Sequence, residues 1–242
     1  KRFLFSKKTD GYISIFTWFS IIGTMIGVSA IIVVMSVMNG FREELITKLL
    51  GMNGHINIFS STNQIKQSTI KAIEKLETNS IDILPMIQTQ ALLISDQNSK
   101  GVYIRSYSSD DLKKKISIKH NMLKGDFYKE SSNEIIIGSV LSRKLNLDLN
   151  DKVKLAIPKS DKTIFGNIPR FKTLEVVGIF DTGMYDYDEN LIFLDLKISR
   201  KLLLLDENNF NQIEVNINDL SNIENQNIII NKLLKKFNTN LY

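Results

Sequence analysis

The residue types that most often carry chemistry are few in this 242-residue chain, and they stand apart from one another. The absence of cysteine excludes disulfides, thiolate metal sites and thiol nucleophiles. The two histidines, His55 and His120, have no histidine or carboxylate at metal-ligand spacing, so each is interpreted as a surface or strand residue. No Gly-x-x-x-x-Gly-Lys-Ser/Thr motif occurs either. We therefore expect no catalytic residue, no metal site, no cofactor and no ATP hydrolysis in this chain.

One acidic cluster, Tyr185-Asp-Tyr-Asp-Glu189, invites comparison with a calcium-binding loop. Such a loop needs regularly alternating oxygen ligands and a glycine at its turn, and the cluster fits this pattern poorly. We predict a solvated turn between two strands instead. The net charge of +5 does not indicate nucleic-acid binding, because the basic residues are scattered among acids without a stacking motif.

A proline-bracketed segment, Pro158–Pro169, is the clearest candidate for a binding element. Strands are expected on both sides of it, and a tight hairpin would need only about two to five connecting residues. The two prolines fix φ and remove two donors, which favours a projecting loop. Ile164 and Phe165 are large apolar groups with no evident core to enter, as in a protein-docking element. From the residues alone, a long surface loop without a binding role is the alternative.

The element expected to anchor these parts is a membrane helix. From Gly11 to Phe41 no residue is charged. Ile13–Met38 is long enough, at about 1.5 Å per residue, to cross a hydrocarbon core of about 30 Å. A signal peptide would have an apolar stretch about half as long and a small-residue cleavage site, and neither is seen. We therefore predict a transmembrane helix over residues 11–38.

The charges on the two sides of this span predict its orientation. Four basic residues lie within the first eight positions, whereas the charges at positions 42–48 nearly cancel. By the positive-inside rule, residues 1–10 are expected in the cytoplasm and everything after about Asn39 outside it.

Small residues on the span predict a partner helix. Gly23 and Gly27 form a small-xxx-small pair, and Ala30 lies about one turn further along the same face. Such a face lets another helix approach closely, although glycine is also simply common in membrane helices. Residues 39–52 then continue with helical periodicity and predict an amphipathic stalk.

The remaining residues alternate between strand-like and helix-like patterns, so the expected fold class is α+β. Residues 53–109 together with 205–242 are assigned to a mixed, discontinuous subdomain, and residues 110–204 to a β-rich subdomain that includes the loop 158–169. The apolar runs Ile81–Ile87 and Ala91–Ile94 are interpreted as separate strands. Helices are expected at about Thr69–Glu77, Val140–Leu147 and Ile223–Phe237.

The membrane segment also carries a family resemblance. The run Trp18-Phe-Ser-Ile-Ile-Gly-Thr-Met-Ile-Gly-Val-Ser-Ala30, followed by Ser36-Val-Met-Asn-Gly-Phe41, closely resembles the first membrane helix of the LolC/LolE family. Members of this family are the permeases of the lipoprotein-releasing ABC transporter. The similarity continues through Ile136–Leu145, Asn150–Val153 and Val176–Phe180, and so covers nearly the whole chain.

The resemblance implies an inner-membrane permease with four membrane helices around a large MacB-like periplasmic domain of two subdomains. It implies as partners a cytoplasmic LolD-like ATPase subunit, a second permease subunit, a LolA-like periplasmic carrier, the lipoprotein substrate and membrane lipid, but no nucleic acid. Whether the permease pair is a homodimer or a LolC–LolE heterodimer stays open.

The resemblance further implies a role for the proline-bracketed segment, which falls where LolC-type members carry a hook that recruits the carrier. The carrier-binding residues implied are Pro158, Ile164, Phe165, Gly166, Pro169, Arg170 and Lys172. The segment is one residue shorter than the family pattern, its tip residues differ, and Phe171 stands where a polar residue is expected. Alternatives are a MacB-like efflux or FtsX-like mechanotransmission permease, which would lack the hook, and a single-span anchored periplasmic interaction domain.

Overall fold

The computed structural model describes most of the chain between residues 11 and 217, and residues 239–241. Residues 1–10 and the predicted helix at 223–237 lie outside the described residues, as does the predicted helix at 69–77 beyond residue 71. The chain divides into two compact units, residues 1–48 and residues 49–242, which are described separately. The described ranges are 11–60, 65–66, 69–71, 81–96, 98–157, 162–163, 166–167, 169–206, 209–217 and 239–241.

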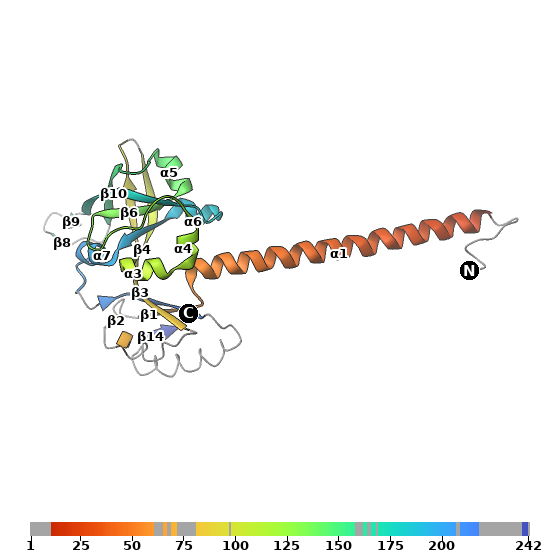
Figure 1. Cartoon of the computed structure of the whole chain (residues 1–242), viewed down its shortest axis with the longest axis horizontal. Helices are drawn as coiled ribbons and strands as arrows, with labels where there is room; N and C mark the ends of the chain where they lie inside the picture. Colours follow the sequence, from red (N-terminus) through yellow and green to blue (C-terminus); the bar gives the residue numbers. More distant parts are fainter. Residues whose placement is uncertain are drawn as a thin grey trace. The chain divides into compact units, whose positions relative to one another are not determined.

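The described part of the first unit belongs to helix α1, which runs from Gly11 to Asn53 (Figure 1). The last five residues of α1, 49–53, belong to the second unit. By length and composition helix α1 can cross a membrane, and at about 1.5 Å per residue it is roughly 65 Å long. Its apolar side chains, such as Phe16 and Phe19, are mostly exposed. A Cβ added at Gly23 or Gly27 would meet open space. The helix therefore presents an apolar surface that lipid or other helices can cover.

Helix α1 ends where a glycine makes the turn. Gly54 has φ +68°, and its N–H donates to the carbonyl oxygen of Leu50 at 2.9 Å. This left-handed conformation after the last helical residue favours glycine. A side chain at this position would also collide with Glu214. The end of α1 is thus fixed by contacts among residues of the second unit.

The second unit is built from strands with helices α3 to α7 among them, and residues 69–71 are also helical. The strands are β1 (Ile56–Ser60), β2 (Ile65–Lys66), β3 (Ile81–Ile94), β4 (Ser99–Tyr107), β5 (Met122–Gly125), β6 (Glu134–Gly138), β7 (Lys152–Ile157), β8 (Lys162–Thr163), β9 (Gly166–Asn167), β10 (Arg170–Phe180), β11 (Leu191–Asp195), β12 (Asn209–Phe210), β13 (Gln212–Ile217) and β14 (Thr239–Leu241). The helices are α3 (Ser109–Lys114), α4 (Ile116–His120), α5 (Ser139–Leu145), α6 (Tyr185–Asn190) and α7 (Leu196–Leu203).

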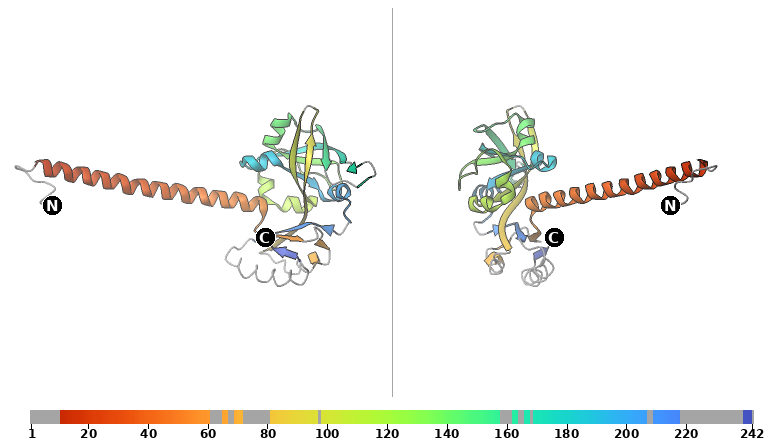
Figure 2. Two further views of the ribbon diagram at one scale, coloured as in Figure 1. Left: turned by 180° about the vertical axis from the view of Figure 1, so that it is seen from behind. Right: turned by 45° about the vertical axis from the view of Figure 1, so that its right-hand side comes forward.

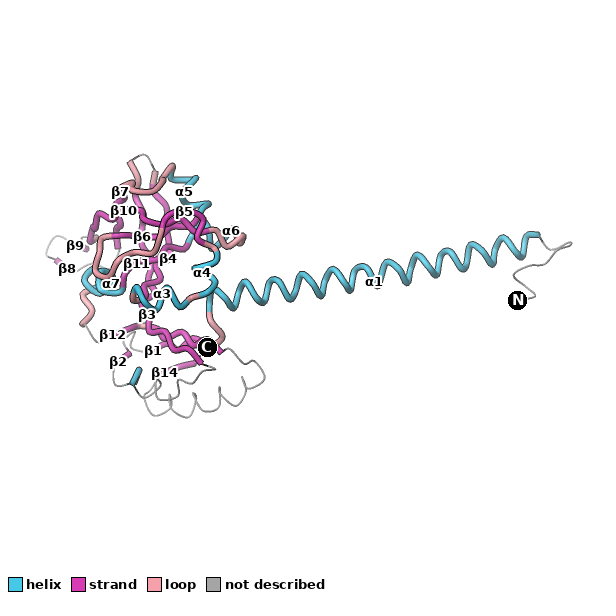
Figure 3. Tube along the Cα trace, in the orientation of Figure 1, coloured by secondary structure: helices cyan, strands magenta, loops and turns pink. Residues whose placement is uncertain are grey.

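Six strands close into a ring in the order β3, β4, β11, β6, β10 and β7, because β7 pairs with β3 as well as with β10 (Figure 3). Alternation along the strands separates the inside of this ring from its outside. In β7, for example, Val153 and Leu155 are buried in the core, whereas Lys152 and Lys154 are exposed. Apolar side chains of α5 and α7 complete the same core.

A second group of strands packs around another core. Strand β13 pairs with β1 and with the first half of β3, and β1 also pairs with β14. Their buried side chains include Ile58, Ile83 and Ile213. The mixture of helices and strands confirms the α+β class.

Strand β3 joins the two groups, since its second half pairs with β4 and β7 in the ring (Figure 2). The prediction of two separate strands at 81–87 and 91–94 was wrong. The polar residues between them do not break the strand, because Gln88 and Gln90 continue the ladder opposite Arg105 and Tyr103. Strand β4 falls in the predicted mixed subdomain, residues 53–109, whereas its partner β11 falls in the predicted β-rich subdomain, residues 110–204. The predicted boundary at residue 109 therefore stays a prediction.

The acidic cluster at 185–189 was also misread. It forms helix α6, and Asp188 and Glu189 are buried rather than solvated. The backbone N–H and the hydroxyl of Thr182 both donate to Asp188, at 2.8 and 2.9 Å. Lys100 and Lys144 both pair with Glu189. Both carboxylates therefore have hydrogen-bond or ion-pair partners within the fold, so they do not need water as a partner.

Candidate functional site

The proline-bracketed segment connects two strands of the ring. Ile157 at the end of β7 pairs with Arg170 at the start of β10, so Pro158–Pro169 is the whole connection. Within it, β8 and β9 pair antiparallel, with Thr163 opposite Gly166. The described part of the segment is thus a hairpin of its own. Pro158 and the two residues between β8 and β9, Ile164 and Phe165, lie outside the described residues.

The residues that leave the segment alternate between the two sides of β10. Arg170 and Lys172 are half-buried, and they pair with Ile157 and Leu155, whose side chains belong to the core of the ring. The guanidinium of Arg170 donates to the carbonyl oxygen of Leu202 in α7 at 3.5 Å. Phe171 points to the outer side and is exposed. The side chain that faces outward directly after the proline-bracketed segment is therefore the aromatic ring of Phe171. A contact between the carrier and Arg170 or Lys172 stays a prediction.

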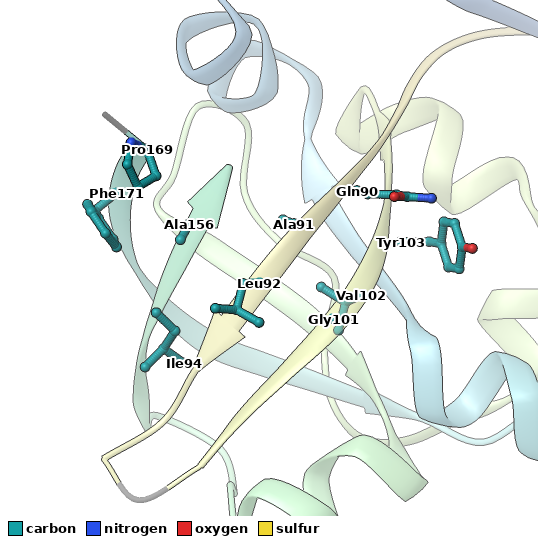
Figure 4. A pocket seen from close by; sticks show the side chains of 10 residues that line it. All are labelled: Gln90, Ala91, Leu92, Ile94, Gly101, Val102, Tyr103, Ala156, Pro169 and Phe171. Atoms are coloured by element: carbon teal, nitrogen blue, oxygen red, sulfur yellow. The ribbon is translucent and has the colours of Figure 1, made fainter. Parts of the chain in front are cut away.

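An apolar row crosses the outer side of the ring from Phe171. Strand pairing places Phe171 beside Ala156, Ala156 beside Leu92, and Leu92 beside Gly101, on four adjacent strands. These residues line a groove of about 590 Å³, together with Tyr103, Pro169 and four others (Figure 4). We call it the outer groove. It begins at Pro169, the last residue of the proline-bracketed segment.

The shape of the outer groove follows from the sizes of its side chains. Leu92 is 40% exposed, Tyr103 48% and Phe171 59%, which is unusual for three neighbouring large apolar groups. In the same row, Ala156 has a small side chain and Gly101 has none, so the surface is recessed at these two positions. The described lining residues carry no charge. The outer groove therefore suits an uncharged, apolar occupant.

A second notable region surrounds the last turn of α1, within the second unit. The guanidinium of Arg105 donates to the carbonyl oxygen of Met52 at 2.7 Å and to the side-chain oxygen of Asn53 at 2.6 Å. The ammonium of Lys115 donates to the same Met52 carbonyl at 3.1 Å. Two cations thus donate to one backbone carbonyl at a helix C-terminus, that of Met52, where the helix dipole favours positive charge.

A buried carboxylate completes this region. Glu214 of β13 forms an ion pair with Lys115, and both side chains are about 1% exposed. The hydroxyl of Tyr107 donates to Glu214 at 2.6 Å. Burial, together with the Glu214 carboxylate, raises the pKa of Tyr107 well above its usual value, and burial lowers the pKa of Lys115. We call Arg105, Tyr107, Lys115 and Glu214 the polar junction, because they tie the end of α1 to β4 and β13.

Metal chemistry finds no support in the part of the chain that the structure describes. No three histidine or carboxylate side chains there are close enough to hold a metal ion.

Sequence reasoning missed both the outer groove and the polar junction. The groove depends on strand register, which brings Phe171 and Leu92 together across a separation of 79 positions in the chain. The one available signal was Phe171 itself, noted as a departure from the expected polar residue. In the polar junction, Lys115 ends a run of three lysines and resembles a solvated charge, so nothing in the pattern indicates its burial.

Comparisons with known proteins agree with this architecture. Residues 17–226 match the family described as MacB-like periplasmic core domain. The lipoprotein-releasing system transmembrane protein LolC of Neisseria meningitidis is 32% identical over 210 residues, which cover 85% of this chain and 50% of that protein. The corresponding LolE of Haemophilus influenzae is 24% identical over 90% of this chain and 54% of that protein. The chain spans about half the length of the curated relatives it matches.

Two solved structures share the fold. The periplasmic region of MacB from Actinobacillus actinomycetemcomitans has a TM-score of 0.54 at 13% identity, covering 79% of this chain and 90% of that one. The extracellular domain of the ABC-type transporter YknZ from Gram-positive bacteria has a TM-score of 0.53 at 9% identity, covering 76% of this chain and 95% of that one.

Proposed function

Because the chain belongs to the MacB-like periplasmic core domain family, and within it to the LolC/LolE proteins, we propose that it is part of an ABC transporter permease that releases lipoproteins. The observation that carries this proposal is the similarity to LolC over 85% of a chain that begins with a helix of membrane-crossing length. In this role the permease extracts a lipoprotein from the inner membrane and passes it to a periplasmic carrier.

The chain performs no chemistry itself in this proposal. Extraction is costly because each buried CH₂ group contributes about 0.8 kcal/mol, so a separate cytoplasmic ATPase subunit of LolD type supplies the energy. A second permease subunit, or another membrane span of the same permease, packs against α1, with the exposed face of Gly23, Gly27 and Ala30 as the contact. The second unit lies in the periplasm, where the proline-bracketed segment recruits a LolA-like carrier.

The orientation is tested by cysteine labelling of the full-length protein in cells. The charge asymmetry across the span predicts that a membrane-impermeant reagent labels a cysteine at Asn63 but not one at Lys7. Equal labelling of both positions, or labelling of Lys7 alone, would remove the orientation and the transport proposal with it.

The carrier-binding role is tested at the tip of the proline-bracketed segment. We expect Phe165→Ala to reduce the affinity of the assembled transporter for a purified LolA-like carrier roughly thirtyfold, as for truncation of a central aromatic group in an interface. Phe165→Glu should reduce carrier capture more severely. The reason is that an apolar tip group gains by burial in the carrier, whereas a carboxylate resists desolvation.

A matched control separates this effect from a general effect of charge. Leu123→Glu places the same carboxylate on an exposed apolar position of β5 and should leave carrier capture unchanged. Thermal unfolding of each variant monitors the fold. Capture by Phe165→Glu at the wild-type level would exclude the carrier-binding role of this segment, and a lower melting temperature would instead place Phe165 in a core.

A further inference from the structure

The outer groove has the dimensions of a ligand site rather than of a surface irregularity. Its volume of about 590 Å³ falls within the range of roughly 300–1,000 Å³ that is typical of small-molecule sites. The row Phe171, Ala156, Leu92 and Gly101 crosses four strands that lie about 4.8 Å apart, so the floor of the groove is about 14 Å long. The groove therefore crosses four strands, and its lining also extends along β3 from Gln90 to Ile94.

The groove offers few hydrogen-bonding partners to whatever occupies it. Gln90 and Tyr103 are the polar side chains among its described lining residues, and both lie on the β3–β4 side (Figure 4). A peptide backbone in the groove would leave most of its N–H and C=O groups without partners, which is costly. A hydrocarbon chain has no such groups to satisfy.

Strand pairing limits the other common way of binding a peptide. A peptide can add to a sheet as a further strand only where a strand edge is free. Leu92 pairs with Gly101 on one side and Ala156 on the other, and Ala156 pairs with Leu92 and Phe171. A peptide strand could therefore add only at the two ends of the row and not at its middle. The uncharged lining and the paired backbone at the middle match a lipid chain better than a protein segment.

We propose that the outer groove binds an acyl chain of the lipoprotein substrate, an inference that rests on the function proposed above. The chain lies across β10, β7, β3 and β4, with Leu92 and Phe171 as its walls and Gly101 and Ala156 as its floor. The hydroxyl of Tyr103 can donate to an ester carbonyl at the end of the chain. Because Pro169 lines the groove, the acyl chain rests directly beside the segment that recruits the carrier.

Photo-crosslinking of the assembled, full-length transporter in nanodiscs tests this proposal. The probe is a synthetic triacylated lipopeptide with a diazirine near the end of one acyl chain, bound without carrier so that the chain stays on the transporter. After irradiation, mass spectrometry should find adducts on the peptides that contain Leu92 and Phe171.

The variant that closes the groove is Gly101→Leu. A Cβ added at Gly101 meets open space, so the new side chain enters the groove without a clash. Displacing two methylene groups corresponds to about tenfold lower occupancy, and the adduct yield should fall accordingly. Lys152→Leu is the matched control, because it adds the same side chain to the outer side of β7 beyond the groove and should keep the wild-type yield.

Each outcome decides between clear alternatives. Equal adduct yields in Gly101→Leu and wild type would overturn the proposal, as would an absence of adducts on the ring strands in a transporter that releases the lipopeptide normally. Benzoylphenylalanine in place of Leu92 provides a second test, and crosslinks to the carrier instead of the lipopeptide would make the occupant a protein. A wild-type transporter without ATP-dependent release would contradict the proposed function itself.

Discussion

The polar junction buries charged side chains, whereas the outer groove exposes large apolar side chains, and both situations are uncommon in proteins. At the polar junction, Lys115 and Glu214 are about 1% exposed, whereas in the outer groove Phe171 is 59% exposed. Charged groups are rarely buried unless they are paired, and neighbouring large apolar groups are rarely exposed unless something covers them. The buried charges have their partners within the fold. The exposed apolar groups have none among the described residues, which marks the groove as the region available for binding.

The largest expected effect comes from breaking the polar junction. Glu214→Leu leaves the Lys115 ammonium buried without its carboxylate and the Tyr107 hydroxyl without an acceptor. We expect the free energy of unfolding to fall by about 3–5 kcal/mol, measured by denaturant titration. The double variant Lys115→Met/Glu214→Leu should be more stable than Glu214→Leu, because no uncompensated charge remains. Additive effects in this cycle would contradict the view that the two side chains act as a pair.

Two neighbouring leucines of β3 sharpen the comparison. Leu93 is fully buried in the ring, whereas Leu92 is 40% exposed in the outer groove. Leu93→Ala should cost about 2–5 kcal/mol of stability, as for truncation in a core, and Leu92→Ala about 1 kcal/mol or less. Thermal unfolding of both variants measures the difference. Similar losses would mean that Leu92 belongs to the core and that the groove is part of the packing.

The smallest effect is expected where charges are paired close to the surface. Lys100 and Lys144 lower the pKa of Glu189 from 4.5 to about 2. Because the folded protein favours the charged form, this pairing stabilises it above about pH 4.5, and the contribution is lost as the pH falls towards 2. The melting temperature of Glu189→Gln should therefore be lower than that of wild type at pH 6 and equal to it near pH 2. A constant difference across this range would exclude the ion pairing as its cause.

The sequence allowed prediction of elements whose signal is local. The helix of membrane-crossing length followed from an uncharged run of about thirty residues, and the strand before the proline-bracketed segment from alternation that ends at Pro158. In each case the signal is contained in the consecutive residues of the element itself.

The features that sequence could not reveal depend on contacts between distant segments. Strand β3 continues through Gln88 and Gln90 because β4 pairs with them. Asp188 of helix α6 can be buried because the N–H of Thr182 donates a hydrogen bond to its carboxylate. The outer groove likewise needs the register of four strands. Single-sequence patterns contain no information on such register, since alternation alone fixes the face of a residue but not its neighbour on the next strand.

The closed ring of strands also determines where this domain can accept insertions during evolution. Adding one residue inside a ring strand turns every following side chain to the opposite face unless a β-bulge absorbs the extra residue, as one does in β10 between Val176 and Gly178 opposite β6. Changes in length therefore cost least in the connections between strands. The twelve-residue connection from Pro158 to Pro169 is one of them, so its length can vary among relatives while the ring that carries it keeps its register.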